Sequence, residues 1–374
     1  MTRVVVVGGG IVGAAAAIEL AGRGADVTLV ESDQPGVRAT GASAGMLAPQ
    51  YEAPGPTPFF RLSLLARDTF PAFVERLETL ADWPLAFRRD GMLVANLDAS
   101  EEEAARGALA WQADAGCAGD VVGPDEALRR HPGLSPDVPS WLWLPDEAQV
   151  DAQRLAVALG SGVRAAGARL LLGRRVVRVL AAGSRVRGVR TADGGELPAD
   201  VVVLAAGAWS GGIEGVPRGV PVRPVRGQML RILPERVPGR PLVATHDGHY
   251  LVPRENGSVL MGSTMEEVGF DDSVTPEARL ELAEHAARLV PELADAPVVE
   301  RWAGLRPVSA DGWPVVGPEP ELEGLVYATG HGRNGILFGP LTGRIVADLV
   351  LDGSSDVPWE PFGPGRLHGG GGAP

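Results

Sequence analysis

The sequence predicts a mixed α/β fold, in which a second, largely antiparallel domain is inserted into a Rossmann-type domain. The first observation is a β-α-β pattern in the first 31 residues, where the strand-like runs Val4–Val7 and Asp26–Val30 enclose an alanine-rich helical segment. The second is that similar buried-type strands recur at Val201–Leu204 and Leu325–Thr329. The third is that antiparallel-looking strands lie between these two.

The remaining elements follow from hydrophobic periodicity and from glycine and proline breaks. Helices are predicted at 62–80, 101–115, 154–166, 277–290 and 340–351. Pro340 is placed in the first turn of the last of these helices, where its missing N–H costs least. Further strands are predicted at 170–172, 176–180, 186–191, 228–233, 250–253 and 259–262.

This alternation predicts a discontinuous arrangement of two domains. The Rossmann-type, cofactor-binding domain takes residues 1–85, 146–215 and 300–362. The substrate domain takes residues 86–145 and 216–299. The glycine-rich tail 363–374 cannot bury a core, so we expect it to be disordered.

The composition excludes several classes of chemistry. All 34 basic residues are arginine, and the 47 acidic residues give a net charge of −13, which argues against a nucleic-acid partner. Without lysine there is no Schiff base and no Walker A site. Cys117 is the single cysteine, so a disulfide, a cysteine-rich zinc site and an iron–sulfur cluster are excluded. Catalysis must therefore use a cofactor, carboxylates, histidines, hydroxyl groups or arginines.

A dinucleotide fingerprint lies in the first β-α-β unit. Gly8, Gly10 and Gly13 form the G-x-G-x-x-G pattern between a strand and a helix, and Glu31 follows about 20 residues later. The helix N-terminus then offers free N–H groups to a pyrophosphate, and the Glu31 carboxylate can accept hydrogen bonds from ribose hydroxyls. The fingerprint itself does not distinguish FAD from NAD.

Three later segments carry a more specific resemblance: Thr40–Leu47, Val201–Trp209 and Tyr327–Ile336. Together with the fingerprint they resemble the flavin-dependent amine and amino-acid oxidases of the D-amino-acid oxidase group, and within it the glycine oxidase branch of the thiamine pathway. The resemblance spans the chain and is specific in these motifs. It implies non-covalently bound FAD at the interface between the two domains.

The resemblance also implies which residues bind the cofactor. Besides the three fingerprint glycines, the expected FAD-binding residues are Ile11, Val12, Glu31, Ser32, Ala39, Thr40, Ala44, Gly45, Met46, Val176, Gly207, His331, Gly332, Arg333, Asn334, Gly335, Ile336 and Leu337. Backbone N–H groups of the last seven would stabilise negative charge that develops on the reduced flavin.

The expected catalytic residues are Arg306, Tyr250, Arg333 and Met265. A carboxylate substrate needs a bidentate cation, and by resemblance Arg306 supplies it with help from the Tyr250 hydroxyl. Arg333 either lies beside the flavin or pairs with an acid, and Met46 and Met265 either pack the pocket or fill gaps in the core.

The implied reaction is oxidative deamination of glycine and other small amines or D-amino acids, with hydride transfer from substrate Cα to flavin. An imine forms, water converts it to a 2-oxo acid and ammonia, and oxygen is reduced to hydrogen peroxide. If the amine binds neutral, no side chain need act as a general base, and no metal is expected. A D-amino-acid dehydrogenase with another electron acceptor, a sarcosine-type amine oxidase and a non-catalytic flavin-binding subunit remain alternatives.

Two weaker patterns point to other chemistry. Gly41–Gly45 matches the G-x-S-x-G elbow of serine hydrolases, but no strand immediately precedes Ser43 and Pro49 stops a following helix. His246 and His249 flank Asp247, which is conceivable as a metal pair but more typical of ordinary hydrogen bonding.

The apolar run 4–21 could pass for a membrane span or a signal peptide. Glu19 and four glycines interrupt the run, and Arg3 is the only positive charge before it. We therefore expect no membrane span and a cytoplasmic protein. The resemblance adds the expectation of a homotetramer.

Overall fold

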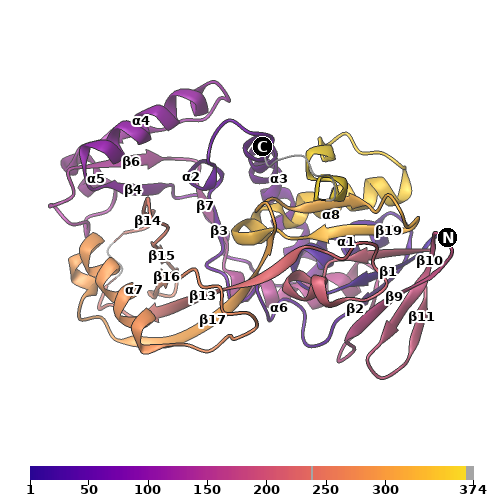
Figure 1. The fold of residues 1–374 in the computed structure, drawn as a ribbon. Coiled ribbons are helices and arrows are strands. Elements are labelled where there is room, and N and C mark those ends of the chain that lie inside the picture. The colour runs from indigo at the N-terminus through magenta and orange to yellow at the C-terminus, as the bar shows by residue number, and fades with distance from the viewer. Residues whose placement is uncertain (237–238, 368–374) are drawn as a thin grey trace.

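Two large β-sheets lie side by side in the computed structural model, which describes residues 1–236 and 239–367. The six-stranded sheet occupies the right half of Figure 1 and the eight-stranded sheet the left half. The two expected kinds of strand therefore separate into two sheets.

The six-stranded sheet is the Rossmann-type sheet. Its strands run in the order β18-β19-β12-β1-β2-β8. All neighbours are parallel except the edge strand β18, which is antiparallel to β19. The bounds are β1 (Arg3–Val7), β2 (Asp26–Val30), β8 (Arg169–Leu171), β12 (Val201–Leu204), β18 (Val315–Pro318) and β19 (Leu325–Thr329). In such folds ligands bind beyond the carboxyl ends of the parallel strands.

The valines of β1 show why this sheet is buried on both faces. Val4 and Val6 point to one face and pack in the cluster formed with the helices. Val5 and Val7 point to the other face, toward the three-stranded sheet. That small sheet consists of β9 (Val176–Ala182), β10 (Arg185–Thr191) and β11 (Glu196–Pro198).

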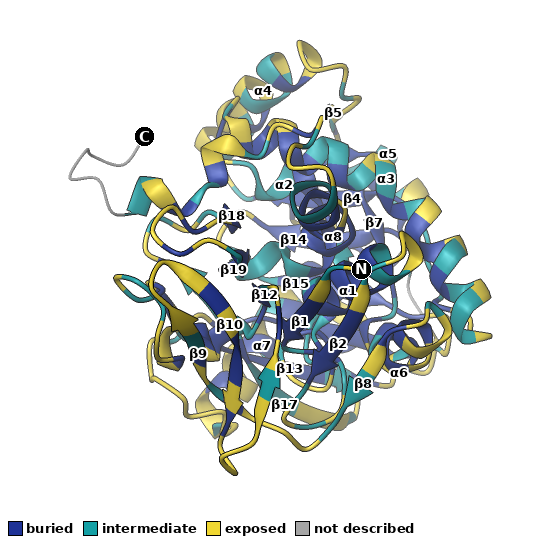
Figure 2. Cartoon of the chain, turned by 90° about the vertical axis from the view of Figure 1, so that its right-hand side faces the viewer, coloured by how far each residue is buried: buried dark blue, intermediate teal, exposed yellow. Residues whose placement is uncertain are grey.

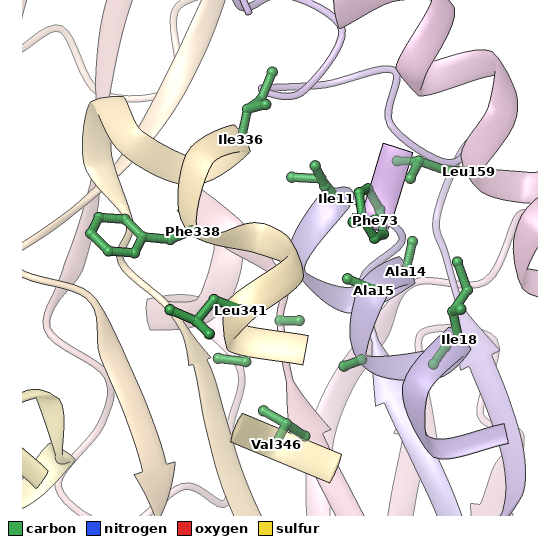
Figure 3. Close-up of a cluster of buried hydrophobic side chains, with 14 of the residues drawn as sticks. Ile11, Ala14, Ala15, Ile18, Phe73, Leu159, Ile336, Phe338, Leu341 and Val346 are labelled. Carbon is green, nitrogen blue, oxygen red and sulfur yellow. The ribbon is translucent and has the colours of Figure 1, made fainter. Parts of the chain in front are cut away.

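Helices α1 (Ile11–Gly22) and α8 (Gly335–Leu351) pack closely against each other under the sheet (Figure 3). A Cβ at Gly343 would lie 2.7 Å from the backbone of Ala15, so the contact needs a glycine at this point. Phe73 and Leu159 join the same cluster from two further helices, α3 (Pro58–Ala81) and α6 (Ala152–Ala165).

The eight-stranded sheet runs in the order β17-β13-β16-β15-β14-β4-β6-β5, and only the β14–β4 pair is parallel. Its strands are β4 (Met92–Asn96), β5 (Asp120–Val122), β6 (Ser140–Leu144), β13 (Val222–Ile232), β14 (Leu242–Thr245), β15 (Tyr250–Pro253), β16 (Val259–Gly262) and β17 (Val298–Ser309). Helices α4 (Ala99–Ala113), α5 (Pro124–Arg130) and α7 (Pro276–Leu289) pack against it. Figure 2 shows exposed residues gathering on the outer helices and turns, around mostly buried central strands.

Short elements connect the two halves. Strand β3 (Met46–Leu47) pairs with β7 (Ala148–Gln149), and helix α2 (Pro49–Glu52) follows β3 directly. The 3-10 turns η1 (Gly207–Gly212) and η3 (Gly332–Asn334) follow β12 and β19, while η2 (Pro291–Leu293) and η4 (Glu360–Phe362) lie further out.

The predicted strands and helices between residues 4 and 351 are present, but the prediction missed several others. Strands β4, β5, β6, β14, β17 and β18 and helix α5 were not anticipated. In the β13–β17 pair, Pro224 lies opposite Pro307, so two residues without an N–H share one position in the ladder. Strand β17 also runs across the boundary predicted at residue 300.

Helix α8 begins at Gly335, so the prediction that Pro340 lies in its first turn is wrong. Pro340 lies inside the helix, where its missing N–H leaves one carbonyl of the preceding turn without its helical partner. The tail also differs from expectation. Pro364–Leu367 form the 3-10 turn η5, and Arg366 pairs with Asp311. Residues 368–374 of the predicted disordered tail lie outside the described residues.

By length and composition, the segment Gly332–Leu351 could cross a membrane. In its most apolar window, 61% of the residues are buried inside the protein, chiefly against α1 and α3. A core helix passes the same test, and packing in the core accounts for the apolar character of this one.

Candidate active site

A cavity of about 500 Å³ lies where the two sheets meet. On one side it is lined by the loops that follow β1, β2, β12 and β19, and on the other by residues of β13, β15 and β17. The predicted ligand edge of the Rossmann-type sheet therefore faces the eight-stranded sheet.

The fingerprint glycines fit the geometry of the first loop. Gly8 has φ +105°, and a Cβ there would overlap the carbonyl oxygen of Ala205, which directly follows β12. A Cβ at Gly13 would overlap the carbonyl oxygen of Gly8, so Gly13 permits close packing of α1 on β1. Gly10 is the N-cap of α1 and offers no capping side chain, while the Ile11 N–H donates to Thr40 Oγ1 (3.1 Å).

Glu31 lies at the end of β2 and lines the cavity. Its Oε2 accepts a hydrogen bond from the Gly9 N–H (2.6 Å), and its Oε1 accepts from the Asp33 N–H and the Ser32 hydroxyl (both 2.9 Å). The carboxylate thus fixes the glycine loop. A carboxylate oxygen can accept more than one hydrogen bond, so Oε2 can also accept one from a ligand in the cavity.

The segment that follows β19 forms another wall of the cavity. His331 Nε2 lies 3.0 Å from Thr342 Oγ1, and burial lowers the pKa of His331 to about 3, so its imidazole is neutral. Asn334 precedes α8 without a side-chain cap, and Gly335 and Ile336 of the first turn of α8 line the cavity. Leu337 points into the core instead.

Arg306 projects from β17 and lies against Gly227 of β13, where a Cβ would overlap the guanidinium. Its Nη1 donates to the carbonyl of Thr264 (3.1 Å) and its Nη2 to the hydroxyl of Ser263 (2.6 Å). Burial lowers the pKa of Arg306, and the neighbouring Tyr250 acts in the opposite direction. Within residues 1–236 and 239–367, no carboxylate lies within 4.0 Å of this guanidinium. Its charge is therefore available to an anionic ligand.

Tyr250 begins β15 and its ring lies against Gly262 of β16. The side chain is buried and lines the cavity, and its hydroxyl lies 3.8 Å from Met229 Sδ. A thioether is a weak acceptor, so this hydroxyl can donate to a better one.

Arg333 differs from Arg306 because it has an acid partner. Its Nε and Nη2 donate to Glu52 Oε1 at 3.1 and 2.9 Å, and both residues line the cavity. Burial is the largest single influence and lowers the pKa of Arg333, but Glu52, Tyr250 and Tyr51 together raise it by more, so the pKa lies above its usual value. Arg333 therefore pairs with an acid, which is one of the two readings from the sequence, and its place beside the flavin stays a prediction.

The cavity wall includes most residues expected to bind the cofactor: Gly8, Gly10, Ile11, Val12, Glu31, Ser32, Ala39, Thr40, Ala44, Met46, Val176, Gly207 and His331 through Ile336. Gly13, Gly45 and Leu337 are not part of the cavity wall, although each directly follows a residue that is. A Cβ at Gly45 would overlap the carbonyl oxygen of Val150. The placement of Met265 in the pocket is wrong: 54% of the residue is exposed, because the chain leaves the sheet after β16.

Sequence reasoning missed two residues that shape the cavity. Glu52 lies on the one-turn helix α2, which carries no motif. Arg254 follows β15 and donates to the carbonyl of Ala44 (2.7 Å), to Gln149 Oε1 (2.8 Å) and to the carbonyl of Val150 (3.1 Å). Burial lowers the pKa of Arg254 to about 10, which still leaves it charged at neutral pH. Arg254 therefore connects the eight-stranded sheet to the loop before β3. The one sequence signal for this role is that Arg254 directly follows a predicted strand.

The serine and histidine patterns take ordinary structural roles. Ser43 Oγ accepts from the Gly45 N–H (3.0 Å) in a turn, without the strand-to-helix elbow of a hydrolase. His246 Nε2 lies 2.8 Å from Asn96 Oδ1. His249 lies between Asp247 and Glu281 and stacks on His285. Ligand atoms of Asp247, His249 and His285 lie within 4.8 Å of one another, outside the cavity wall.

A family model described as "FAD dependent oxidoreductase" matches residues 3–349. The chain belongs to this family. The FAD-dependent oxidoreductase is 37% identical to a glycine oxidase from Pseudomonas aeruginosa over 98% of this chain and 99% of that protein. It is also 37% identical to a bifunctional protein ThiO/ThiG from Trichormus variabilis, over 95% of this chain but only 54% of that protein. The chain thus spans about half the length of that relative.

A solved structure supports the same assignment. The crystal structure of glycine oxidase from Geobacillus kaustophilus superposes with a TM-score of 0.92 at 32% identity, covering 97% of this chain and 98% of the other. The mixed α/β fold with a Rossmann-type FAD-binding sheet, expected from the sequence, is therefore confirmed.

The cavity fits the family cofactor. The N-termini of α1 and α8 both reach it, and neither has a hydrogen bond from the side chain of its own N-cap residue. Added Cβ atoms at Gly207 and Gly332 would meet no atom within 4 Å, so both glycines border open space. Cys117 lies outside the cavity wall, which agrees with non-covalent FAD. The loops after β1 and β2 would hold the pyrophosphate and ribose, and the segment before α8 would hold the flavin.

Proposed function

We propose that this FAD-dependent oxidoreductase oxidises glycine and other small amines or D-amino acids. In the overall reaction for glycine, water and oxygen are consumed, and glyoxylate, ammonia and hydrogen peroxide are released. The observation that carries the proposal is the partly buried Arg306 guanidinium, which lines the cavity without a carboxylate partner among the described residues. The near full-length likeness to glycine oxidases supports it.

Each side chain at this end of the cavity has a role in the proposal. Arg306 binds the substrate carboxylate with its planar fork, and the Tyr250 hydroxyl donates a further hydrogen bond to it. This fixes the substrate Cα toward the segment 331–336. Bound FAD supplies the hydride acceptor, and N–H groups at the start of α8 stabilise the negative charge of the reduced state.

The proposal assigns no general base to the protein. His331 is neutral but buried and bonded to Thr342, and Glu52 is held by Arg333. The substrate amine is therefore expected to react in its neutral form, and water hydrolyses the resulting imine to the 2-oxo acid and ammonia.

The wider expectations remain proposals. Segments 1–85, 146–215 and 300–362 form the cofactor domain, and segments 86–145 and 216–299 form the substrate domain. We also propose a cytoplasmic homotetramer without a membrane span. A role in thiamine biosynthesis is supported by the likeness to the protein named ThiO/ThiG.

The test is anaerobic mixing of the purified flavoprotein with glycine, sarcosine, D-alanine and D-proline. Glycine is expected to bleach the flavin absorbance, and admission of air to restore it with formation of hydrogen peroxide. Bleaching without reoxidation by air would favour a dehydrogenase that uses another acceptor. No bleaching by any of these amines would contradict the proposal.

A further inference from the structure

The two arginines at the substrate end of the cavity are not equivalent. Within the part of the chain that the structure describes, Arg306 donates hydrogen bonds to two neutral oxygens, the Thr264 carbonyl and the Ser263 hydroxyl. Arg333 is bound through two nitrogens to Glu52. Both arginines lie close enough to Tyr250 for their pKa values to respond to it. Taken together, Arg306, Arg333 and Glu52 carry a net charge of +1, which one substrate carboxylate neutralises.

Glu52 is held in place rather than free to turn away. The preceding residues of α2 are anchored on both sides, because the Gln50 N–H donates to Glu147 Oε1 (2.8 Å) and the Tyr51 hydroxyl donates to the carbonyl of Thr245 (2.8 Å). The Glu52 side chain is only 12% exposed. These anchors hold the backbone of α2, and the two hydrogen bonds from Arg333 hold the Glu52 carboxylate at the cavity wall.

Arg333 is confined in the same way. A Cβ at Gly248 would lie 3.1 Å from Arg333 Nη1, so the guanidinium packs against the turn between β14 and β15. The Arg333 side chain is 25% exposed. If Glu52 lost its charge, this guanidinium would become a second unpaired cation in the same cavity.

We infer that Glu52 is a specificity-determining residue that excludes substrates with a second carboxylate. Glu52 neutralises Arg333 and repels a second substrate carboxylate, so amines with two carboxylates such as iminodiacetate are disfavoured. The inference rests on the proposed amine-oxidising function. It narrows the substrate class to amines that carry no more than one carboxylate.

The first test compares two secondary amines that differ by one carboxylate, sarcosine and iminodiacetate. In the wild-type holoenzyme, the Kd from anaerobic flavin reduction is expected to be at least about tenfold weaker for iminodiacetate, which corresponds to about 1.4 kcal/mol of repulsion. Comparable Kd values for the two amines would overturn the inference without any variant. If neither they nor glycine reduce the flavin, the proposed function fails, and the inference fails with it.

The second test uses variants of the pair. Glu52→Gln is expected to improve the Kd of iminodiacetate relative to sarcosine by about tenfold or more, and Glu52→Asp to keep the wild-type preference. The gain should disappear when Arg333→Met is added to Glu52→Gln. The matched control is Glu323→Gln, which removes one negative charge from an exposed pair with Arg185. An unchanged ratio in Glu52→Gln, or an equal change in Glu323→Gln, would overturn the inference.

A third measurement is independent of turnover. Acetate and malonate also differ by one carboxylate and carry no amine to oxidise, so calorimetric titration of the oxidised holoenzyme reports binding alone. Glu52→Gln is expected to favour malonate over acetate by about tenfold relative to wild type. No change in the malonate-to-acetate ratio would contradict the assignment.

Discussion

The cofactor half and the substrate half of the cavity are built by different means. In the proposed cofactor half, the groups expected to bind the ligand are mostly backbone amides, and they depend on glycines close together in sequence, such as Gly8, Gly10 and Gly13. In the substrate half the groups are side chains, and Arg306 and Tyr250 come from strands far apart in the chain. A backbone site depends on conformation and close packing, whereas a side-chain site depends on charge and hydrogen bonding.

The largest expected effect is in the cofactor half. Gly8→Ala forces a Cβ into the carbonyl of Ala205 at a positive φ, so we expect a loss of about 3–5 kcal/mol of stability and purification without bound flavin. Denaturant unfolding and flavin absorbance measure both effects. Gly24→Ala is the control, because Gly24 has φ +89° but no neighbouring atom within 4 Å, and it should cost only about 1–2 kcal/mol. Equal losses in the two variants would refute the close-packing role of Gly8.

The second largest loss of stability is expected at Arg254, which connects the two halves. Arg254→Met leaves the Ala44 and Val150 carbonyls and Gln149 Oε1 without their donor, so we expect a loss of about 2–4 kcal/mol and weaker retention of FAD. Thermal unfolding with and without added FAD measures this loss. Arg185→Met, at an exposed arginine, should change stability by less than about 0.5 kcal/mol. A stable Arg254→Met holoenzyme would show that the loop before β3 needs no such tie.

The same contrast explains which parts of the structure could be predicted from the sequence. The β1-α1-β2 unit was predictable because its signal is local: Val4–Val7, the glycines and Glu31 lie within 31 residues. The last strand before α8 was predictable for the same reason, as were β13, β15 and β16, whereas the other five strands of the eight-stranded sheet were not. Strand β17 was not, because most of its residues are partly exposed and two prolines face each other across the β13–β17 pair.

Residues of the substrate half were harder to identify. Arg306 was found only through a family resemblance, since nothing local separates it from the other 33 arginines. Glu52 and Arg254 were missed because their partners, Arg333 and Ala44, are distant in sequence and brought close only by the fold. Met265 was misplaced because its motif gave no information on the direction of its side chain.

A smaller effect concerns Glu147, a buried carboxyl group beneath α2. Burial raises its pKa to about 8, and its Oε2 has no hydrogen-bond partner in residues 1–236 and 239–367. The folded-state pKa of Glu147 exceeds its unfolded value, so the fold is stabilised by having this carboxyl group protonated. That stabilisation is complete below about pH 4.5. It is lost as pH rises toward 8, at up to about 1.4 kcal/mol per pH unit.

Glu147→Gln should therefore flatten the fall in stability between pH 5 and 8, and the variant should gain most at the alkaline end of that range. Denaturant unfolding at several pH values measures the slope. A parallel slope in the wild type and the variant would show that Glu147 is ionised in the folded protein.

The smallest effect is expected from a single hydroxyl in the substrate half. Tyr250→Phe removes one donor to the substrate carboxylate but keeps Arg306, so the Kd for glycine should weaken by about 0.5–1.5 kcal/mol. The rapid kinetics of anaerobic reduction give this Kd. Tyr327→Phe is the control, because its hydroxyl bonds to Glu319 away from the cavity and its loss should leave the Kd unchanged.

The most direct test of the account is carboxylate recognition by Arg306. Arg306→Met should weaken glycine binding in the anaerobic reduction assay by about 2–5 kcal/mol, because the substrate carboxylate loses its buried cation. Methylamine, which is glycine without its carboxylate, should reduce the wild type and the variant equally. A variant that loses glycine but not methylamine supports the account. Unchanged glycine affinity, or an equal loss for both amines, would contradict it.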